Sequence, residues 1–149
     1  MEEPLKKLNK HEEKLVDIKF KIIFVGRKDR IPESMKEVIK RVEAATKNNE
    51  GMTLQASLDY GSKDELIHAF ENAEKPYTEE NVRKHLYVKQ DVDLLIRTSG
   101  EQRLSNYLLW QVAYAEFIFV KKHWPAFREK DLKKAIKKYS KRNRRFGAL

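Results

Sequence analysis

The chain has 149 residues, of which 37% are charged and 40% hydrophobic, a composition typical of one globular domain with a densely ionic surface. It contains no cysteine, which excludes disulfides and thiolate metal sites and fits a reducing cytoplasm. No apolar run approaches the roughly 20 residues that span a bilayer, and the charged N-terminus does not have the pattern of a signal peptide. We therefore expect residues 1–149 to form a single soluble domain.

The net charge of +9 is concentrated in one segment. Residues 121–145 hold twelve lysines and arginines against two acidic residues, whereas the rest of the chain is close to neutral. Such a basic segment serves RNA, anionic lipid or a phosphorylated substrate, or is simply a solvated helix face. It lacks interleaved surface aromatics, which disfavours nucleic acid as a partner. A peripheral contact with a membrane stays open.

Hydrophobic periodicity predicts alternating helices and strands from the N-terminus onward. The first element is an amphipathic helix whose apolar residues are Leu5, Leu8, Leu15 and Val16. Residues 18–25 read as a strand that ends at Gly26, and a helical stripe covers residues 34–47. Gly51 then suits a left-handed helix cap. Alternation over residues 52–58 predicts the second strand.

The second half of the chain continues this alternation. Ser62 and Glu65 have the capping-box spacing of a helix start, and a shorter helix is expected after Thr78. The remaining predicted elements are a strand over 92–97, a helix that includes residues 108–112, a strand over 117–120 and a last helix over 129–144.

This order of elements predicts an α/β fold. The four strands should form a mostly parallel sheet with helices on both faces and right-handed crossovers. Four strands are few for a sheet that must be covered on both sides. We therefore expect further strands to precede these residues in the complete fold.

The polar loop after the third predicted strand is the most informative. Ligands of open α/β sheets usually lie beyond the carboxyl ends of the strands. Here Arg97 leaves the strand, Gly100 allows a tight backbone, and Arg103 and Ser105 follow before the expected helix. Two guanidinium groups, a hydroxyl and amides at a helix start would make a cradle for phosphate or diphosphate. The alternative is that the arginines form salt bridges with Glu101 and its neighbours.

Residues 93–116, with the sequence DLLIRTSGEQRLSNYLLWQVAYAE, resemble the signature of cis-prenyltransferases, the undecaprenyl and dehydrodolichyl diphosphate synthase family. Residues 144–147 resemble the Arg-x-Gly motif that ends this family. Looser similarity is carried by IKFKIIFVG at 18–26 and by MTLQASLDYGSKDEL at 52–66. The resemblance identifies residues 1–149 as the C-terminal part of a cis-prenyltransferase domain, an incomplete version of that fold.

The resemblance also implies roles for individual residues. Those expected to hold the diphosphate of isopentenyl diphosphate are Arg97, Gly100, Arg103 and Ser105. Glu116 would help to coordinate Mg²⁺ in the assembled site, since magnesium prefers hard oxygen ligands. Arg145 and Gly147 would reach the diphosphate in a neighbouring subunit's site. The simpler alternatives are that Glu116 caps a strand end and that Arg145 is a solvated charge.

Two departures from the family pattern matter. At residues 59–63 the chain has Asp-Tyr-Gly-Ser-Lys where the family usually has Asn-Tyr-Gly-Gly-Arg, so Lys63 keeps the charge but loses the bidentate fork. The family's Asp-Gly-Asn-Gly/Arg-Arg-Trp loop and its Ser-x-Glu-Asn-Trp-type segment have no counterpart in the sequence. In the family these parts hold the allylic diphosphate and a second magnesium ligand, and they wall the tunnel for the growing chain.

Two main functional hypotheses follow. In the first, the chain is the isopentenyl-diphosphate-binding part of a cis-prenyltransferase. It would condense isopentenyl diphosphate with an allylic diphosphate only when the missing N-terminal part is supplied, because no complete catalytic set is present. In the second, it is a non-catalytic accessory subunit of a heteromeric cis-prenyltransferase. Such subunits usually lose the Arg-Thr-Gly-Gly-Glu loop, whose equivalent is kept here, which favours the first hypothesis.

A degenerate relic is a third alternative. Under the first two hypotheses the protein is expected in the cytoplasm, as a homo-oligomer or with a partner chain that carries the missing N-terminal strands.

Overall fold

A computed structural model of the chain describes residues 19–142. The predicted N-terminal helix, Arg145 and Gly147 lie outside the described residues. The chain divides into two compact units, residues 1–61 and residues 62–149.

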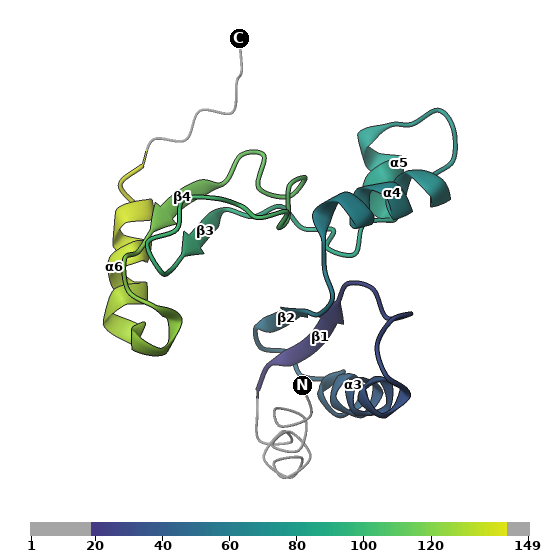
Figure 1. Cartoon of the computed structure of the whole chain (residues 1–149), viewed down its shortest axis with the longest axis horizontal. Coiled ribbons are helices and arrows are strands. Elements are labelled where there is room, and N and C mark those ends of the chain that lie inside the picture. Colours follow the sequence, from purple (N-terminus) through teal and green to yellow (C-terminus); the bar gives the residue numbers. More distant parts are fainter. Residues whose placement is uncertain (1–18, 143–149) are drawn as a thin grey trace. The chain divides into compact units, whose positions relative to one another are not determined.

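The first unit is a β-α-β arrangement. Strand β1 (Lys21–Val25), helix α3 (Glu33–Thr46) and strand β2 (Thr53–Ser57) follow one another along the chain. The two strands pair in parallel over their whole length, and α3 packs against β1 (Figure 1). Apolar side chains make the core between helix and sheet, namely Ile22, Phe24, Val38 and Val42.

Side chains of α3 also close the outer edge of β1. The Ile22 amide donates to Thr46 Oγ1 at 3.1 Å, and the Phe24 amide donates to Glu43 Oε1 at 2.8 Å. Edge amides satisfied in this way cannot pair with another strand. Within the described residues β2 is therefore the strand of this sheet that can accept a further neighbour.

Two glycines permit close backbone contacts in the first unit. Gly26 ends β1 with φ 123°, and a Cβ atom there would lie 2.2 Å from the Leu58 carbonyl oxygen. A Cβ atom on Gly51 would lie 2.1 Å from the Lys19 carbonyl oxygen. Gly51 is not in the left-handed region, so its predicted role as a helix cap is wrong; it is required for space.

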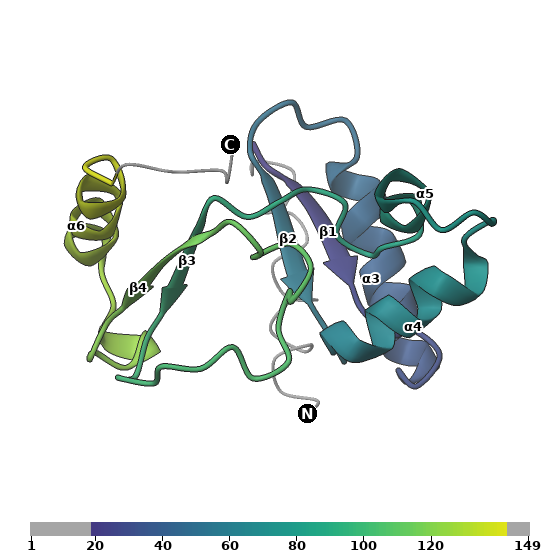
Figure 2. The ribbon, with the colours of Figure 1, turned by 90° about the horizontal axis from the view of Figure 1, so that it is seen from above.

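The second unit carries the remaining elements, which are α4 (Ser62–Asn72), α5 (Glu79–Lys84), β3 (Leu94–Arg97), β4 (Glu116–Phe119), the 3-10 helix η1 (Trp124–Ala126) and α6 (Glu129–Tyr139). Strands β3 and β4 pair in parallel (Figure 2). Helices α4 and α5 share a small core of Ala69, Val82 and Leu86. The Thr78 side chain accepts the Asn81 amide at 3.1 Å and so caps α5 as the sequence predicts.

The α/β class and the parallel pairing of the strands are confirmed. In the part of the chain that is described, however, the strands form two sheets of two, β1-β2 and β3-β4, instead of one sheet of four. The hydrophobic pattern of a segment predicts that it is extended, but it does not predict which strand it pairs with. No described strand pairs with members of both sheets. Among residues 19–142 there is also no helix long and apolar enough to cross a membrane.

The predicted helix over residues 108–112 is wrong. This stretch forms successive turns, because Ser105, Asn106 and Leu108 all adopt left-handed backbone conformations with φ of 52°, 61° and 48°. A continuous right-handed helix cannot pass through such residues. The apolar spacing arises because Leu108 and Val112 are both buried, which consecutive turns achieve as well as a helix does.

Candidate functional site

The loop that follows β3 is anchored first to the segment after β4. The Ser99 amide donates to the Lys122 carbonyl at 2.7 Å, and the Gly100 amide donates to the Val120 carbonyl at 3.0 Å. Ser99 and Gly100 both have positive φ, 68° and 71°. A Cβ atom on Gly100 would meet only Lys121 Cα, at 3.9 Å. Glycine is therefore favoured at position 100 because of the positive φ of the loop, and not because a side chain would lack space.

The predicted diphosphate ligands lie in and beside this loop. Arg97 is the last residue of β3 and is half-buried, whereas Arg103 and Ser105 are exposed. Arg103 Nη1 forms an ion pair with Glu101 Oε2, so the salt bridge considered as the alternative is present. Its side chains are 61% and 40% exposed, and exposed ion pairs contribute little to stability. A multiply charged anion can therefore compete with Glu101 for the Arg103 guanidinium.

The sequence predicted that amides at a helix start would contribute to the cradle. No helix starts here, because residues 105–114 form turns. The amides of Ser99 and Gly100 are also engaged by backbone carbonyls. The capacity of the loop to bind an anion therefore rests on the side chains of Arg97, Arg103 and Ser105.

The second half of the loop is anchored to the start of α4. The Ser62 amide donates to the Asn106 carbonyl at 2.9 Å, and the Lys63 amide donates to Asn106 Oδ1 at 2.9 Å. In return, the Leu109 amide donates to Ser62 Oγ at 2.9 Å. The helix start at Ser62 was predicted correctly, but its amides are capped by Asn106, from a distant part of the chain. Sequence reasoning missed Asn106, whose only local signal is the tolerance of asparagine for positive φ.

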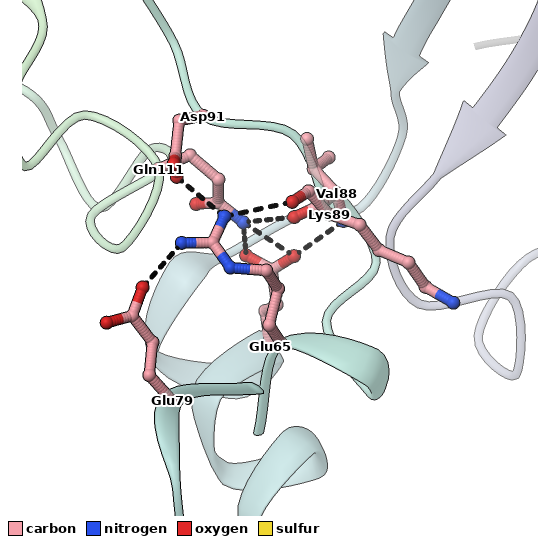
Figure 3. A network of polar contacts seen from close by, with 7 residues as sticks. Glu65, Glu79, Val88, Lys89, Asp91 and Gln111 are labelled. Atoms are coloured by element: carbon pink, nitrogen blue, oxygen red, sulfur yellow. Dashed lines mark hydrogen bonds and ion pairs between the residues drawn. The ribbon is translucent and has the colours of Figure 1, made fainter. Parts of the chain in front are cut away.

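A buried polar network fastens the same segment to α4 one turn further on (Figure 3). Glu65 and Gln111 are 0% and 1% exposed. Gln111 Nε2 lies 3.2 Å from each carboxylate oxygen of Glu65 and donates to the Val88 carbonyl at 2.7 Å, while the Val88 amide donates to Glu65 Oε1 at 2.9 Å. The spacing of Ser62 and Glu65 predicted a capping box, but the Glu65 carboxylate is used in this network.

Arg83 on α5 stabilises the loop that contains Val88. Its guanidinium donates to the Lys89 carbonyl at 3.1 Å, to Asp91 at 2.8 Å and to Glu79 at 2.7 Å. The hydrogen bond to Asp91, followed by the one to Glu79, raises the pKa of Arg83 above its usual value. The Arg83 guanidinium therefore stabilises this part of the fold and is not a candidate for ligand binding.

Glu116, the expected magnesium ligand, begins β4 opposite Leu94, whereas Arg97 ends β3. Arg97 lies three positions further along the strand direction than Glu116, about 10 Å, and strand alternation directs the two side chains to opposite faces. The Glu116 carboxylate lies 3.3 Å from Arg142 Nη1. The described residues do not bring Glu116 to Arg97.

A magnesium site requires several hard oxygen ligands in octahedral geometry. The Glu116 carboxylate has the right chemistry, but one oxygen ligand does not make a site. No group of three or more His, Cys, Asp or Glu side chains able to hold a metal occurs in the described part of the chain. These residues do not fit a magnesium ion without further ligands.

The segment after β4 is tied to α6 by an ion pair. Lys122 Nζ lies 2.7 Å from Asp131 Oδ1, and this hydrogen bond lowers the pKa of Asp131 below its usual value. The pair forms part of a pocket of about 380 Å³ whose lining includes Lys121, Lys134 and Lys138. Because the Lys122 carbonyl holds Ser99, the position of α6 bears on the loop after β3.

The loops at the carboxyl end of β1 and β2 contain arginines that are already paired. The Arg30 guanidinium makes two hydrogen bonds to Asp59, at 2.8 and 2.9 Å. Arg27 makes a similar pair with Asp29, and the Arg27 hydrogen bond lowers the pKa of Asp29 to about 2. The aspartate at position 59, one of the departures from the expected pattern, thus neutralises Arg30.

Comparisons with known proteins agree with this architecture. Residues 1–147 match the family model described as "Putative undecaprenyl diphosphate synthase". The chain is 40% identical to an isoprenyl transferase of Fusobacterium nucleatum, with 97% of this chain and 65% of that protein covered. It is 45% identical to an isoprenyl transferase of Thermotoga maritima, with 87% and 60% covered. The chain thus spans less than two thirds of the length of these relatives.

Crystal structures that are similar to this chain include the following two. One is a probable undecaprenyl diphosphate synthase from Campylobacter jejuni, with a TM-score of 0.84 and 29% identity over 97% of this chain and 73% of that protein. The other is lavandulyl diphosphate synthase from Lavandula x intermedia in complex with dimethylallyl diphosphate, with a TM-score of 0.85 and 32% identity over 95% of this chain and 66% of that protein.

Proposed function

The chain belongs to the undecaprenyl diphosphate synthase family of cis-prenyltransferases, and we propose that its 149 residues form the isopentenyl-diphosphate-binding part of such an enzyme. The assembled enzyme condenses isopentenyl diphosphate with an allylic diphosphate and creates a Z double bond. The residues that seat the allylic diphosphate are supplied from outside these 149 residues, on the same polypeptide or on another.

The loop after β3 carries the proposal. Arg97 has no carboxylate partner among residues 19–142, and Arg103 has only the exposed pair with Glu101. A diphosphate carries several negative charges and accepts bidentate hydrogen bonds from guanidinium groups. In this role Arg97 and Arg103 bind and orient the diphosphate, and the Ser105 hydroxyl donates to it.

The split sheet supports the need for further residues. Each described strand has one neighbour, and parallel sheets are normally extended and covered on both faces. Among the described residues of the first unit, β2 is the strand whose edge can accept a further strand, because α3 closes the edge of β1. An added parallel strand would pair with main-chain groups that are expensive to leave unsatisfied in a core.

The ligand role is tested by calorimetry with isopentenyl diphosphate. Arg103→Ala removes a charge-assisted contact of about 1.5–3 kcal/mol, so binding should weaken roughly tenfold or more. Arg103→Lys should recover part of the affinity, because the charge is kept and the fork is lost. Lys40→Ala on α3 is the matched loss of a surface cation and should leave binding unchanged. Equal binding by wild type and Arg103→Ala would refute the assignment.

The assembly role is tested by prenyl transfer. The 149-residue chain alone should not extend farnesyl diphosphate, because it lacks the residues that stabilise the leaving diphosphate. Addition of the N-terminal part of a family member in trans should give turnover. A monomeric chain that extends farnesyl diphosphate unaided would contradict the proposal. Binding without turnover in the supplemented mixture would favour the alternative, a non-catalytic accessory subunit.

Further features belong to the proposed assembly. Glu116 would supply one carboxylate ligand to a Mg²⁺ ion whose other ligands come from outside the described residues, and the ion would provide positive charge for the substrate's phosphates. Arg145 and Gly147 would act toward the neighbouring subunit of a homo-oligomer or of a complex with a partner chain. We place the protein in the cytoplasm. The lysines around α6 suit a peripheral contact with anionic lipid.

A further inference from the structure

The segment that carries Ser105 has a backbone that cannot be explained by local preferences. Ser105, Asn106 and Leu108 all have left-handed backbone conformations. This conformation is unfavourable for most residues, because Cβ comes close to the following carbonyl oxygen. Asparagine is among the side chains that tolerate it best, whereas serine and leucine do not prefer it. Contacts elsewhere must therefore hold this segment in place.

Those contacts converge on Asn106. Its main-chain carbonyl accepts the Ser62 amide and its side-chain Oδ1 accepts the Lys63 amide, both at 2.9 Å. The amides at the start of a helix have no partner within the helix, so Asn106 satisfies two donors that α4 would otherwise leave to water. The Leu109 amide donates to buried Ser62, which fixes the segment on the other side of Asn106.

We propose that Asn106 is a positioning residue that docks the diphosphate-binding loop onto the start of α4 and thereby orients the Ser105 hydroxyl beside Arg103. This inference rests on the proposed function of the loop. Ser105 directly precedes Asn106, so the bonds at Asn106 determine where the serine Cα lies. Asn106 itself does not touch the substrate. Because α4 is held by the Glu65–Gln111 network, it provides a fixed support.

Substitutions at position 106 separate the two contributions of the asparagine. Asn106→Gly keeps the left-handed backbone and the main-chain acceptor but loses Oδ1, so inorganic diphosphate should bind about fivefold more weakly in calorimetry on the 149-residue chain. Asn106→Ala also opposes the left-handed conformation and should weaken binding by about tenfold or more. Asn72→Ala, at the far end of the same helix, is the matched control and should bind as wild type.

Hydrogen exchange on the wild-type chain tests whether diphosphate binding is coupled to the contacts of Asn106 with α4. This measurement does not depend on whether a variant folds. If diphosphate needs the docked loop, its addition must slow exchange at the Ser62 and Lys63 amides, because coupling between two sites is reciprocal. Exchange at Ala73, which follows α4 and whose amide donates to the Ala69 carbonyl, should not change. Asn106→Asp keeps an acceptor and tolerates positive φ, so protection of the Lys63 amide should return relative to Asn106→Ala.

The outcomes separate this inference from the proposed function. Loss of binding in Arg103→Ala with unchanged binding in Asn106→Ala and Asn106→Gly would overturn the positioning role alone. Exchange at Ser62 and Lys63 that ignores saturating diphosphate would overturn it as well. Unchanged binding in Arg103→Ala would instead remove the diphosphate site on which the inference rests.

Discussion

Arginines follow parallel strands in both units, but they differ in whether their guanidinium groups are paired with carboxylates. In the first unit Arg27 and Arg30 are each held by an aspartate through two hydrogen bonds. In the second unit Arg97 has no carboxylate partner among residues 19–142, and Arg103 makes a single exposed ion pair. A guanidinium fork that is already filled offers an anion little, whereas an unfilled one can bind phosphate.

The units also differ in how their backbones are fixed. The first unit relies on a direct approach of strands that only glycine permits at position 26. Side chains satisfy distant backbone groups in both units, as Thr46 does for β1 and Gln111 does for Val88. In the second unit, however, Asn106 does so from a segment whose residues are left-handed. In the second unit these contacts hold a loop with left-handed residues in place, and that loop carries the proposed binding groups.

The largest expected effect is on the first unit. Gly26→Ala combines a left-handed φ with a Cβ atom 2.2 Å from a carbonyl oxygen, and should lower the free energy of unfolding by about 3 kcal/mol or more. Gly100→Ala has positive φ but open space around it, so about 1 kcal/mol is expected. Urea unfolding of both variants measures the difference. Equal losses would show that the close approach at Gly26 is not limiting.

The buried network should give the next largest effect. Gln111→Leu keeps the volume but removes the donor to Glu65 and leaves the Val88 carbonyl without this partner. Unsatisfied buried groups are costly, so the free energy of unfolding should fall by about 2–3 kcal/mol. The exposed Gln102→Leu is the control and should change it by less than about 0.5 kcal/mol. A stability loss in Gln111→Leu no larger than in the control would mean that the network contributes only packing.

The electrostatic comparison is tested by a pair of substitutions. Arg97→Gln should weaken binding of isopentenyl diphosphate about tenfold, because it removes a cation with an unfilled fork. Arg30→Gln removes the same charge from a guanidinium already held by Asp59, and affinity should change less than about twofold. Calorimetry at fixed ionic strength compares them. Similar losses of affinity in both variants would indicate that the overall charge of the protein, and not a specific site, attracts the ligand.

A pH effect should be smallest. The folded pKa of Asp131 is lowered by its hydrogen bond from Lys122 below the ordinary value of 3.8. The stabilisation from this pair is therefore complete above the unfolded pKa and is lost as the pH falls through the lower folded pKa. Asp131→Asn should therefore reduce the fall in melting temperature that the chain shows as the pH is lowered below the ordinary value of 3.8. An unchanged slope would show that other acids, such as Asp29, dominate.

The sequence by itself determined the elements and the loop that carries the chemistry. Alternation over residues 52–58 and short apolar runs elsewhere placed all four strands to within three residues at each end, because the hydrophobic pattern of a short strand is a local property. Arg97, Gly100 and Arg103 were identified from their types and order, and the structure holds Gly100 in the left-handed conformation expected of a tight loop.

Only the tertiary structure decided how these pieces are joined. The pairing of strands into two sheets, the turns at 105–114 and the cap supplied by Asn106 all depend on contacts between residues far apart in the sequence. Local patterns cannot distinguish a helix from turns when both bury Leu108 and Val112. Nor can they reveal which donor a carboxylate such as Glu65 will meet, because Gln111 lies 46 positions away and burial arises only when the chain folds.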